Sequence, residues 1–248
     1  MNAEHPAAVL WDMDGTLIDS EPLWGIALQE VAHELGGTMG DEARAFLIGS
    51  DLPTSVDVLL AEVGRPATPE LVAHTAERLL VRTAPLFVAG APWRPGAQAA
   101  LGTVRDAGLP TALVTNTVRR IAEMALDGIG RGFFDVVVCG DDVAAGKPAP
   151  DPYLRAAELL GVTVTDCVAV EDSPDGALSA DRAGAAVLVV PSEVPVPGGP
   201  RRVHRPDLVG LTVHELAAVL RGAPTEEPPD GVGSSDGQEG GSSASRVA

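Results

Sequence analysis

Hydrophobic residues gather along the chain in five short runs that are rich in β-branched side chains. The runs are nearly continuous rather than alternating with polar residues, which is typical of strands covered on both faces. They span residues 7–11, 111–114, 136–139, 167–170 and 186–190. We therefore predict five buried strands.

Helical patterns separate the later runs, and a glycine follows each of them, where a helix commonly ends. These helices are expected at residues 97–107, 118–127, 152–160 and 175–183, with a further short helix at 214–220. The alternation of strands and helices predicts an α/β fold with a parallel sheet and right-handed crossovers.

The first and second predicted strands are separated by far more residues than a crossover requires. The intervening segment has a helical pattern, so we predict a helical cap at residues 19–91, inserted into a core of residues 1–18 and 92–221. Its hinges are expected near residues 17–22 and 90–95. The last segment, 222–248, is acidic and rich in Gly, Ser and Pro, which predicts a disordered tail.

Polar side chains follow the predicted strands at the points where they end. In open parallel sheets the carboxyl ends of the strands share one edge, and ligands bind there. Two of these residues are aspartates one residue apart, which repel each other unless a cation or hydrogen bonds compensate. The set consists of Asp12 and Asp14 after the first strand, Thr115 and Asn116 after the second, Lys147 in the loop after the third, and Glu171 and Asp172 after the fourth.

Each of these residues has an ordinary structural interpretation when it is taken alone. A carboxylate at a strand end is usually a helix cap or a solvated turn, Thr115 alone would be an N-cap, and Lys147 alone would be a surface residue. The ordered combination of all of them is what indicates a site.

Two stretches of sequence carry a resemblance to a known family. WDMDGTLIDSEPLW and GKPAPDPY resemble motifs of the haloacid dehalogenase superfamily, in the subgroup with a helical cap after the first motif. The resemblance covers residues 9–216. It implies a Rossmann-like core, an inserted cap, and a Mg²⁺-dependent phosphatase or phosphotransferase.

The resemblance also implies roles for the residues at the strand ends. Asp12 would be the nucleophile that forms an aspartyl-phosphate. Asp14 would protonate the departing alkoxide and then deprotonate the hydrolytic water. Thr115 and the backbone amide of Asn116 would hold phosphate oxygens, and Lys147 would bridge Asp12 and the phosphate.

A magnesium ion explains why so many carboxylates should gather, because Mg²⁺ prefers oxygen ligands and screens the charge of a phosphate. By resemblance its ligands would be the side chains of Asp12 and Asp172 and the backbone carbonyl of Asp14. Glu171 would bind it directly or through a water.

The cap decides between hydrolysis and phosphoryl transfer to a second hydroxyl. The resembling mutases carry a His on the first cap helix and a Ser-Arg pair in a later loop. Here Trp24 stands at the first position, and the loop at 49–53 has no arginine. This favours a phosphatase acting on a small phosphorylated metabolite such as a sugar or polyol phosphate, with a β-phosphoglucomutase-like mutase as the alternative. Trp24 lines the substrate pocket or packs within the cap, and the sequence leaves both open.

Two other functions remain less favoured alternatives. A haloacid dehalogenase uses no metal and does not need Asp14, Glu171 or Asp172. A non-catalytic phosphate-binding protein would not need every family motif intact. Arg94, Arg119 and Arg120 could contact a substrate, although exposure to solvent is the commoner role for the last two.

Composition limits the partners and the compartment. The net charge is −18, from 17 basic and 35 acidic residues, which argues against binding nucleic acid. No apolar run is long enough for a membrane span, and no secretory signal is recognised. Cys139 and Cys167 lie in or beside apolar runs and are expected to be buried, reduced thiols. We therefore expect a monomeric cytoplasmic enzyme.

Overall fold

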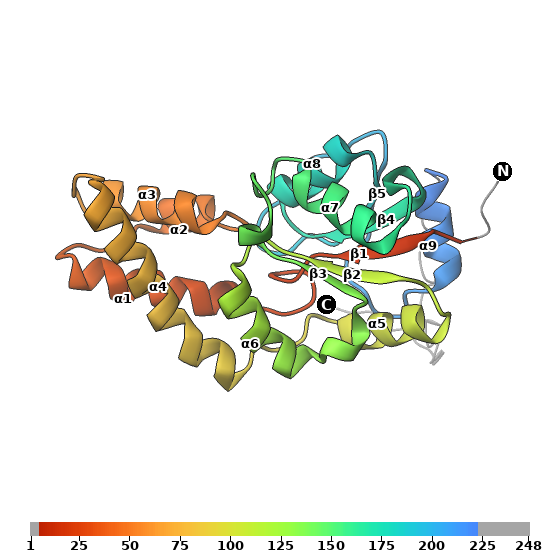
Figure 1. Cartoon of the computed structure of the whole chain (residues 1–248), viewed down its shortest axis with the longest axis horizontal. Coiled ribbons are helices and arrows are strands. Elements are labelled where there is room, and N and C mark those ends of the chain that lie inside the picture. Colours follow the sequence, from red (N-terminus) through yellow and green to blue (C-terminus); the bar gives the residue numbers. More distant parts are fainter. Residues whose placement is uncertain (1–4, 223–248) are drawn as a thin grey trace, which may run out of the picture.

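The computed structural model describes residues 5–222, and its centre is a six-stranded parallel sheet (Figure 1). The strand order is β3-β2-β1-β4-β5-β6. The strands are β1 (Ala8–Trp11), β2 (Thr111–Val114), β3 (Val136–Val138), β4 (Cys167–Glu171), β5 (Ala186–Val189) and β6 (Arg202–His204). The predicted α/β fold class is confirmed.

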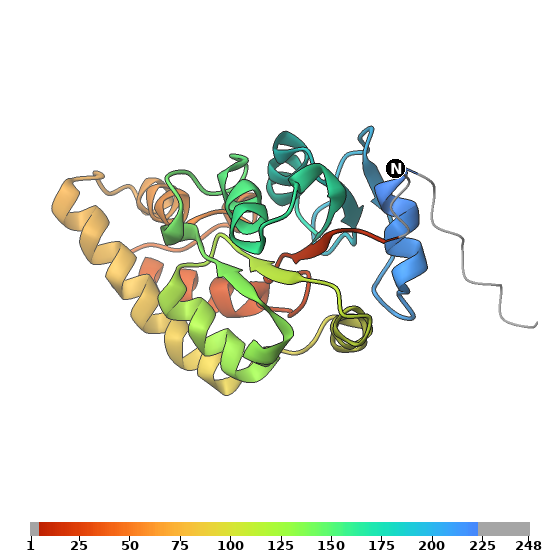
Figure 2. The same cartoon turned by 45° about the vertical axis from the view of Figure 1, so that its right-hand side comes forward.

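Helices cover both faces of the sheet, as Figure 2 shows. Alternate residues of β1 point to opposite faces, so Val9 and Trp11 belong to one hydrophobic cluster and Ala8 and Leu10 to the other. Because neither face meets water, the strands need no polar alternation, which explains their continuous hydrophobicity. One cluster is completed by α5 (Ala97–Asp106), α6 (Arg119–Ile129) and α9 (Val213–Leu220), and the other by α7 (Asp151–Leu160) and α8 (Pro174–Ala183).

The sequence missed the sixth strand. Residues Arg202–His204 of β6 pair with β5 at the edge of the sheet, and their side chains are half-buried or exposed. A three-residue edge strand that consists of an arginine, a valine and a histidine has no hydrophobic run to reveal it. Strand β4 also runs one residue further than predicted, so Glu171 is its last residue.

Four helices lie between β1 and α5, at one end of the molecule (Figure 1). We call them the cap helices: α1 (Glu21–Glu34), α2 (Asp41–Phe46), α3 (Leu52–Glu62) and α4 (Pro69–Ala89). They enclose a hydrophobic cluster of their own, which includes Val31, Leu60 and Leu79. The exact division of the chain at residues 19 and 91 stays a prediction.

The two connections between the cap helices and the sheet run side by side. The N–H of Asp19 donates to the carbonyl of Pro92 at 2.8 Å, and the N–H of Arg94 donates to the carbonyl of Leu17 at 2.9 Å. This pairing holds the start of α1 close to the end of β1, and therefore close to the carboxyl edge of the sheet.

Three remaining expectations concern other parts of the chain. Cys139 and Cys167 are buried and free, and burial raises the pKa of both thiols to about 12. Across residues 5–222 no helix is both long and apolar enough to traverse a bilayer. The tail predicted to be disordered lies, from residue 223 onward, outside the described residues.

Candidate active site

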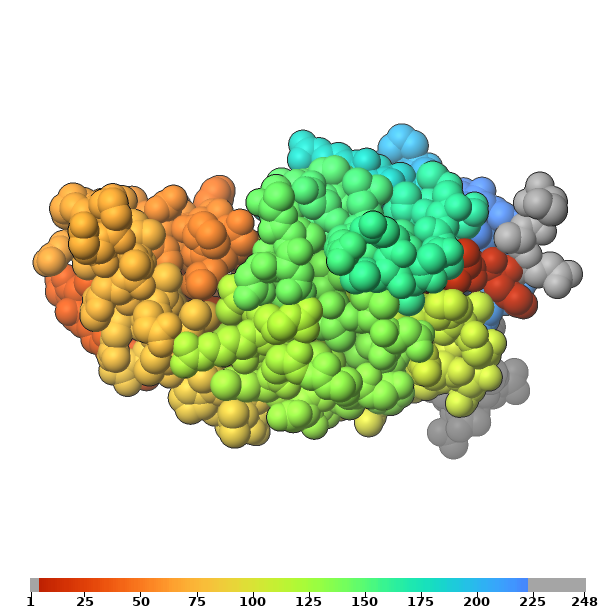
Figure 3. All heavy atoms as spheres, viewed as in Figure 1, coloured from red at the N-terminus to blue at the C-terminus, as the bar shows by residue number. Residues whose placement is uncertain are grey.

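A cavity lies between the carboxyl edge of the sheet and the cap helices, and the predicted site residues meet there. Figure 3 shows the cap helices, in orange, standing against the green part of the core. The cavity is lined by Asp12, Asp14, Trp24, Thr115, Asn116 and Lys147. Glu171 and Asp172 are buried and lie beside Asp12. The strand ends therefore bring together the residues that the sequence singled out.

Three carboxylates form a buried cluster at the ends of β1 and β4, which are neighbours in the sheet. Asp12, Glu171 and Asp172 each offer an oxygen, and these oxygens lie within 4.8 Å of one another. When all three are ionised, the single neighbouring ammonium of Lys147 leaves the group with a net charge of −2. Like charges this close in a dry site repel strongly.

Lys147 is held between two of these carboxylates. Its Nζ donates to Asp12 Oδ1 and to Glu171 Oε1, both at 2.6 Å, and the residue is only 4% exposed. Burial alone would lower the pKa of Lys147, but the two carboxylates outweigh it and hold the pKa above its usual value. The lysine is therefore a fixed positive charge beside Asp12.

Asn116 fixes the loop that carries Lys147. Its Oδ1 accepts from the Lys147 backbone N–H at 2.7 Å, and its Nδ2 donates to the Lys147 carbonyl at 3.1 Å. The same Nδ2 donates to the carbonyl of Gly49, between α2 and α3, at 3.0 Å. The Asn116 side chain thus joins the core loop to the cap helices.

The carboxylate cluster fits a divalent cation. Asp12 Oδ2 is buried and has no hydrogen-bond partner within the described part of the chain. Burial raises the pKa of Asp12 to about 7; Lys147 opposes this shift, while Glu171 and Asp14 add to it. Burial, with the charges of Asp12 and Glu171, also holds the pKa of Asp172 well above its usual value. A divalent cation that prefers oxygen ligands would bind the unpartnered oxygen and offset the repulsion among these buried carboxylates.

A glycine makes room for this cluster. Gly15 has φ +77°, and a Cβ there would come within 2.1 Å of Asp172 Oδ2. Only glycine combines this backbone conformation with the absence of a side chain. The carboxylate of Asp172, which directly follows β4, therefore requires a glycine after Asp14.

Asp14 has a different environment from Asp12. Its Oδ1 accepts from Ser20 Oγ at 2.6 Å and from Trp24 Nε1 at 3.3 Å. Its Oδ2 accepts from Thr115 Oγ1 at 3.0 Å and from Thr117 Oγ1 at 2.8 Å. Neutral donors therefore surround Asp14, whereas a lysine and two carboxylates surround Asp12. Two neighbouring carboxyl groups with such different surroundings can have separate protonation roles.

Trp24 satisfies both interpretations of its position. The indole lines the cavity and donates to Asp14, and its ring packs edge-on against Phe87 of α4 at 5.8 Å between ring centroids. It is therefore anchored in the cap helices and also contributes to the site.

Sequence reasoning missed several residues of the site. Ser20 and Thr117 follow recognised motif residues closely, and their proximity along the chain was an available signal. Tyr153 lies within GKPAPDPY; its hydroxyl donates to Glu171, and its ring centroid lies 5.3 Å from Lys147 Nζ. It helps to hold the carboxylate that pairs with the lysine.

Two residues of the cap helices were also missed, Glu21 and Arg44, and both line the cavity. Burial raises the pKa of Glu21 to about 8, and the charges of Asp14 and Glu193 add to this shift. Arg44 lies in α2, whose six residues include no buried ones. No pattern in the sequence marks a residue on so short and exposed a helix.

The three arginines that the sequence offered as substrate contacts do not line this cavity. Arg119 pairs with Asp142 and Glu123, and Arg120 pairs with Glu77. Arg94 lines a separate small pocket beside Gly15.

Comparisons with known proteins agree with this geometry. Residues 6–184 match the model of a family described as haloacid dehalogenase-like hydrolase. The chain is 34% identical to hexitol phosphatase A of Escherichia coli, over 85% of this chain and 91% of that protein. It is 31% identical to a phosphoglycolate phosphatase of Neisseria meningitidis, over 74% and 80%. The fold resembles a crystal structure of CbbY from Rhodobacter sphaeroides in complex with phosphate, with a TM-score of 0.74, 28% identity, and coverage of 83% of this chain and 96% of that one.

Proposed function

The chain belongs to the haloacid dehalogenase-like hydrolase family and is a phosphatase of that family, and from this premise we propose its substrate and mechanism. It hydrolyses monophosphate esters of small polyhydroxylated metabolites, sugar or polyol phosphates, with Mg²⁺ and through an aspartyl-phosphate. The observation that carries this proposal is the buried group of three carboxylates and Lys147 at the base of the cavity.

Asp12 is the proposed nucleophile. Its carboxylate lines the cavity and is paired with Lys147, whose positive charge lessens repulsion between the carboxylate and a phosphate dianion. A carboxylate oxygen of Asp12 bonds to phosphorus while the ester P–O bond breaks. The products of this step are the aspartyl-phosphate and the alkoxide of the substrate.

Asp14 is the proposed acid and base. It gives a proton to the departing alkoxide, and it later takes a proton from the water that cleaves the aspartyl-phosphate. The four donors around its carboxylate support this role, because they keep the group at the wall of the cavity beside Asp12. Thr115, the amide of Asn116 and Lys147 are the proposed phosphate-binding groups.

The side chains of Asp12, Asp172 and Glu171, with the backbone carbonyl of Asp14, would hold the magnesium ion. When bound, this ion supplies positive charge for the phosphoryl oxygens. The fit rests on three buried carboxylates whose oxygens lie within 4.8 Å of one another and on the unpartnered oxygen of Asp12.

The substrate class is supported by the walls of the cavity and by the relatives. Glu21, Ser50 and Ser55 of the cap segment line it and are suited to binding hydroxyl groups. One relative is named a hexitol phosphatase. The N–H of Trp24 can only donate a hydrogen bond, so Trp24 cannot exchange protons as a histidine at this position could. This favours hydrolysis, and a mutase stays the second candidate. A monomeric cytoplasmic enzyme stays a prediction from the sequence.

The experiment is turnover of 4-nitrophenyl phosphate and of sorbitol 6-phosphate by purified protein, with Mg²⁺ and with EDTA. We expect activity that requires Mg²⁺ and that falls at least about a thousandfold in Asp12→Asn. Asp106→Asn, on the exposed end of α5, is the matched control and should keep wild-type turnover.

Thermal melting completes this test. Mg²⁺ should raise the melting temperature of the wild type, because a ligand that binds only the folded state stabilises it. Asp172→Asn should lose most of that increase. Wild-type turnover by folded Asp12→Asn, or full activity in EDTA, would refute the mechanism.

A further inference from the structure

The cap side of the cavity contains a notch formed by one glycine. Gly25 lies in the interior of α1, where glycine is less favourable than alanine by about 1 kcal/mol. A Cβ at this position would lie 2.9 Å from Arg44 Nη1 and 3.4 Å from Arg44 Cδ. The missing side chain therefore gives the Arg44 guanidinium its place against α1.

Arg44 has no acidic partner there. Between residues 5 and 222 no carboxylate lies within 4.0 Å of its guanidinium, and its side chain makes no hydrogen bond. The other basic residue that lines the cavity, Lys147, is already bound to Asp12 and Glu171. Among the described residues that line the cavity, Arg44 is therefore the basic residue whose donors have no partner.

Glu21 shares this wall with Arg44. It stands four residues before Gly25, on the same face of α1, and it also lines the cavity. Burial raises the pKa of Glu21 to about 8, so its carboxyl group can donate as well as accept a hydrogen bond near neutral pH. The wall therefore offers a guanidinium donor at Gly25 and a carboxyl group one helical turn before it.

This combination suits hydroxyl groups better than a second anion. A hydroxyl can accept from Arg44 and donate to Glu21. A second phosphate or a carboxylate would also meet Arg44, but it would lie near Glu193, which lines the same cavity. Like charges in a site of this kind oppose binding.

We propose that Arg44, seated against Gly25, and Glu21 bind the hydroxyl groups of the substrate's polyol or sugar part and so determine its specificity. The proposal rests on the proposed function, because it assumes that the phosphate binds at Asp12 and Lys147. Arg44 and Glu21 contact the part of the substrate that leaves as the alcohol.

Binding to a protein that cannot turn over separates this proposal from the catalytic one. In the Asp12→Asn protein with Mg²⁺, calorimetry would measure the Kd of sorbitol 6-phosphate and of inorganic phosphate. Arg44→Ala should weaken sorbitol 6-phosphate at least about tenfold and leave inorganic phosphate within about twofold. Arg44→Lys should recover only part of the loss, because a lysine lacks the planar pair of donors.

A pair of glycine substitutions tests the notch. Gly25→Ala should weaken sorbitol 6-phosphate about threefold or more, because the new Cβ displaces the guanidinium. Gly102→Ala is the matched control, since Gly102 is also inside a helix, α5, and a Cβ there meets nothing within 4 Å. Both should raise the melting temperature slightly, and only Gly25→Ala should change binding.

Three results would overturn the proposal. Equal weakening of both ligands by Arg44→Ala would place Arg44 at the transferred phosphate, and no weakening would make it a solvated surface residue. Tighter binding of a sugar bisphosphate that Arg44→Ala abolishes would assign Arg44 to a second phosphate. None of these results depends on turnover, so a wild type without phosphatase activity would refute the proposed function and leave the binding result standing.

Discussion

The two sides of the cavity differ in how completely their polar groups are satisfied. On the core side, Lys147, Asp12 and Glu171 are each no more than 5% exposed. The ammonium of Lys147 donates hydrogen bonds of 2.6 Å to both carboxylates. On the cap side, Arg44 is exposed and has no partner among the described residues. The core side is organised before the substrate arrives, whereas the cap side has donors that no described residue uses.

This difference separates chemistry from recognition. Groups that stabilise a reacting phosphate act best when they are already fixed, because no reorganisation is then needed during the reaction. Groups that recognise the remainder of a substrate can stay solvated until it binds. We therefore expect substitutions on the core side to change both stability and turnover, and substitutions on the cap side to change selectivity.

The largest effect is expected for Lys147→Met. It leaves Asp12 and Glu171 buried without their cation, and removing one partner of a buried ion pair destabilises a protein by about 3–5 kcal/mol. For a chain of this size that lowers the melting temperature by roughly 6–20 °C. Turnover should also fall by several orders of magnitude. Thermal melting measures the change in stability, and hydrolysis of 4-nitrophenyl phosphate measures the change in turnover.

Arg155→Met is the control for this prediction. Arg155 pairs with Glu158 at 2.6 Å, but their side chains are 45% and 68% exposed, so the expected loss is below about 1 kcal/mol. If the two substitutions lowered the melting temperature equally, the contrast between a fixed core side and an open surface would be wrong.

The sequence predicted the core side because its residues are fixed by position relative to strands. Asp12, Thr115 and Glu171 each directly follow a hydrophobic run, and parallel strands must bring such positions to one edge. The three-residue strand β6 was missed, since an edge strand with partly exposed side chains leaves no such run.

The cap side was less predictable for a physical reason. The contact of Arg44 with Gly25 joins two helices through an angle that no local pattern encodes, and α2 buries no residue that would mark its orientation. In the sequence, Gly25 is only a glycine within the segment predicted to be the helical cap. Only the three-dimensional arrangement shows which side chain occupies the space above it.

A smaller effect, dependent on pH, is expected for Glu21→Gln on the cap side. The pKa of Glu21 is raised from 4.5 to about 8 in the folded protein, chiefly by burial. Between these values the folded state binds more protons than the unfolded state, so ionisation of Glu21 reduces stability progressively as the pH rises. A glutamine is neutral throughout and avoids this loss.

Melting curves from pH 4.5 to pH 8.5 test this prediction. The melting temperature of Glu21→Gln relative to wild type should increase with pH, by about 2–4 °C for each kcal/mol gained. Glu158→Gln, on an exposed part of α7, should show no such trend. A difference that stayed constant with pH would mean that Glu21 is ionised in the folded protein across this range.

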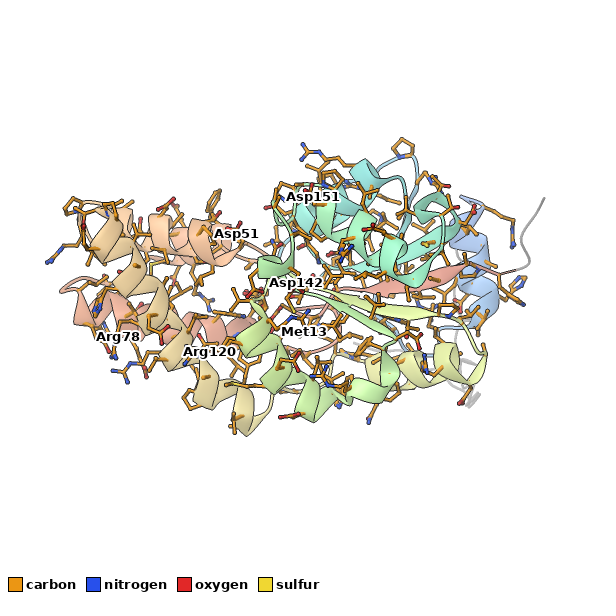
Figure 4. All side chains as sticks on the ribbon, in the orientation of Figure 1. Met13, Asp51, Arg78, Arg120, Asp142 and Asp151 are labelled. Carbon is orange, nitrogen blue, oxygen red and sulfur yellow. The ribbon has the colours of Figure 1, made fainter. Side chains whose placement is uncertain are left out.

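The smallest effect is expected for Arg120→Ala, which tests whether the two sides are joined by charge. Arg120 of α6 pairs with Glu77 of α4 at 3.0 Å, across the boundary between core and cap helices (Figure 4). Their side chains are 47% and 59% exposed, so solvent screens the pair and its loss should reduce stability by less than about 1 kcal/mol. Turnover of sorbitol 6-phosphate should stay within twofold, and a double-mutant cycle with Glu77→Ala should give a coupling energy below the same limit. A large fall in kcat with little change in stability would instead show that this pair sets the position of the cap helices, and the cap side could no longer be treated as a wall that acts through substrate contacts alone.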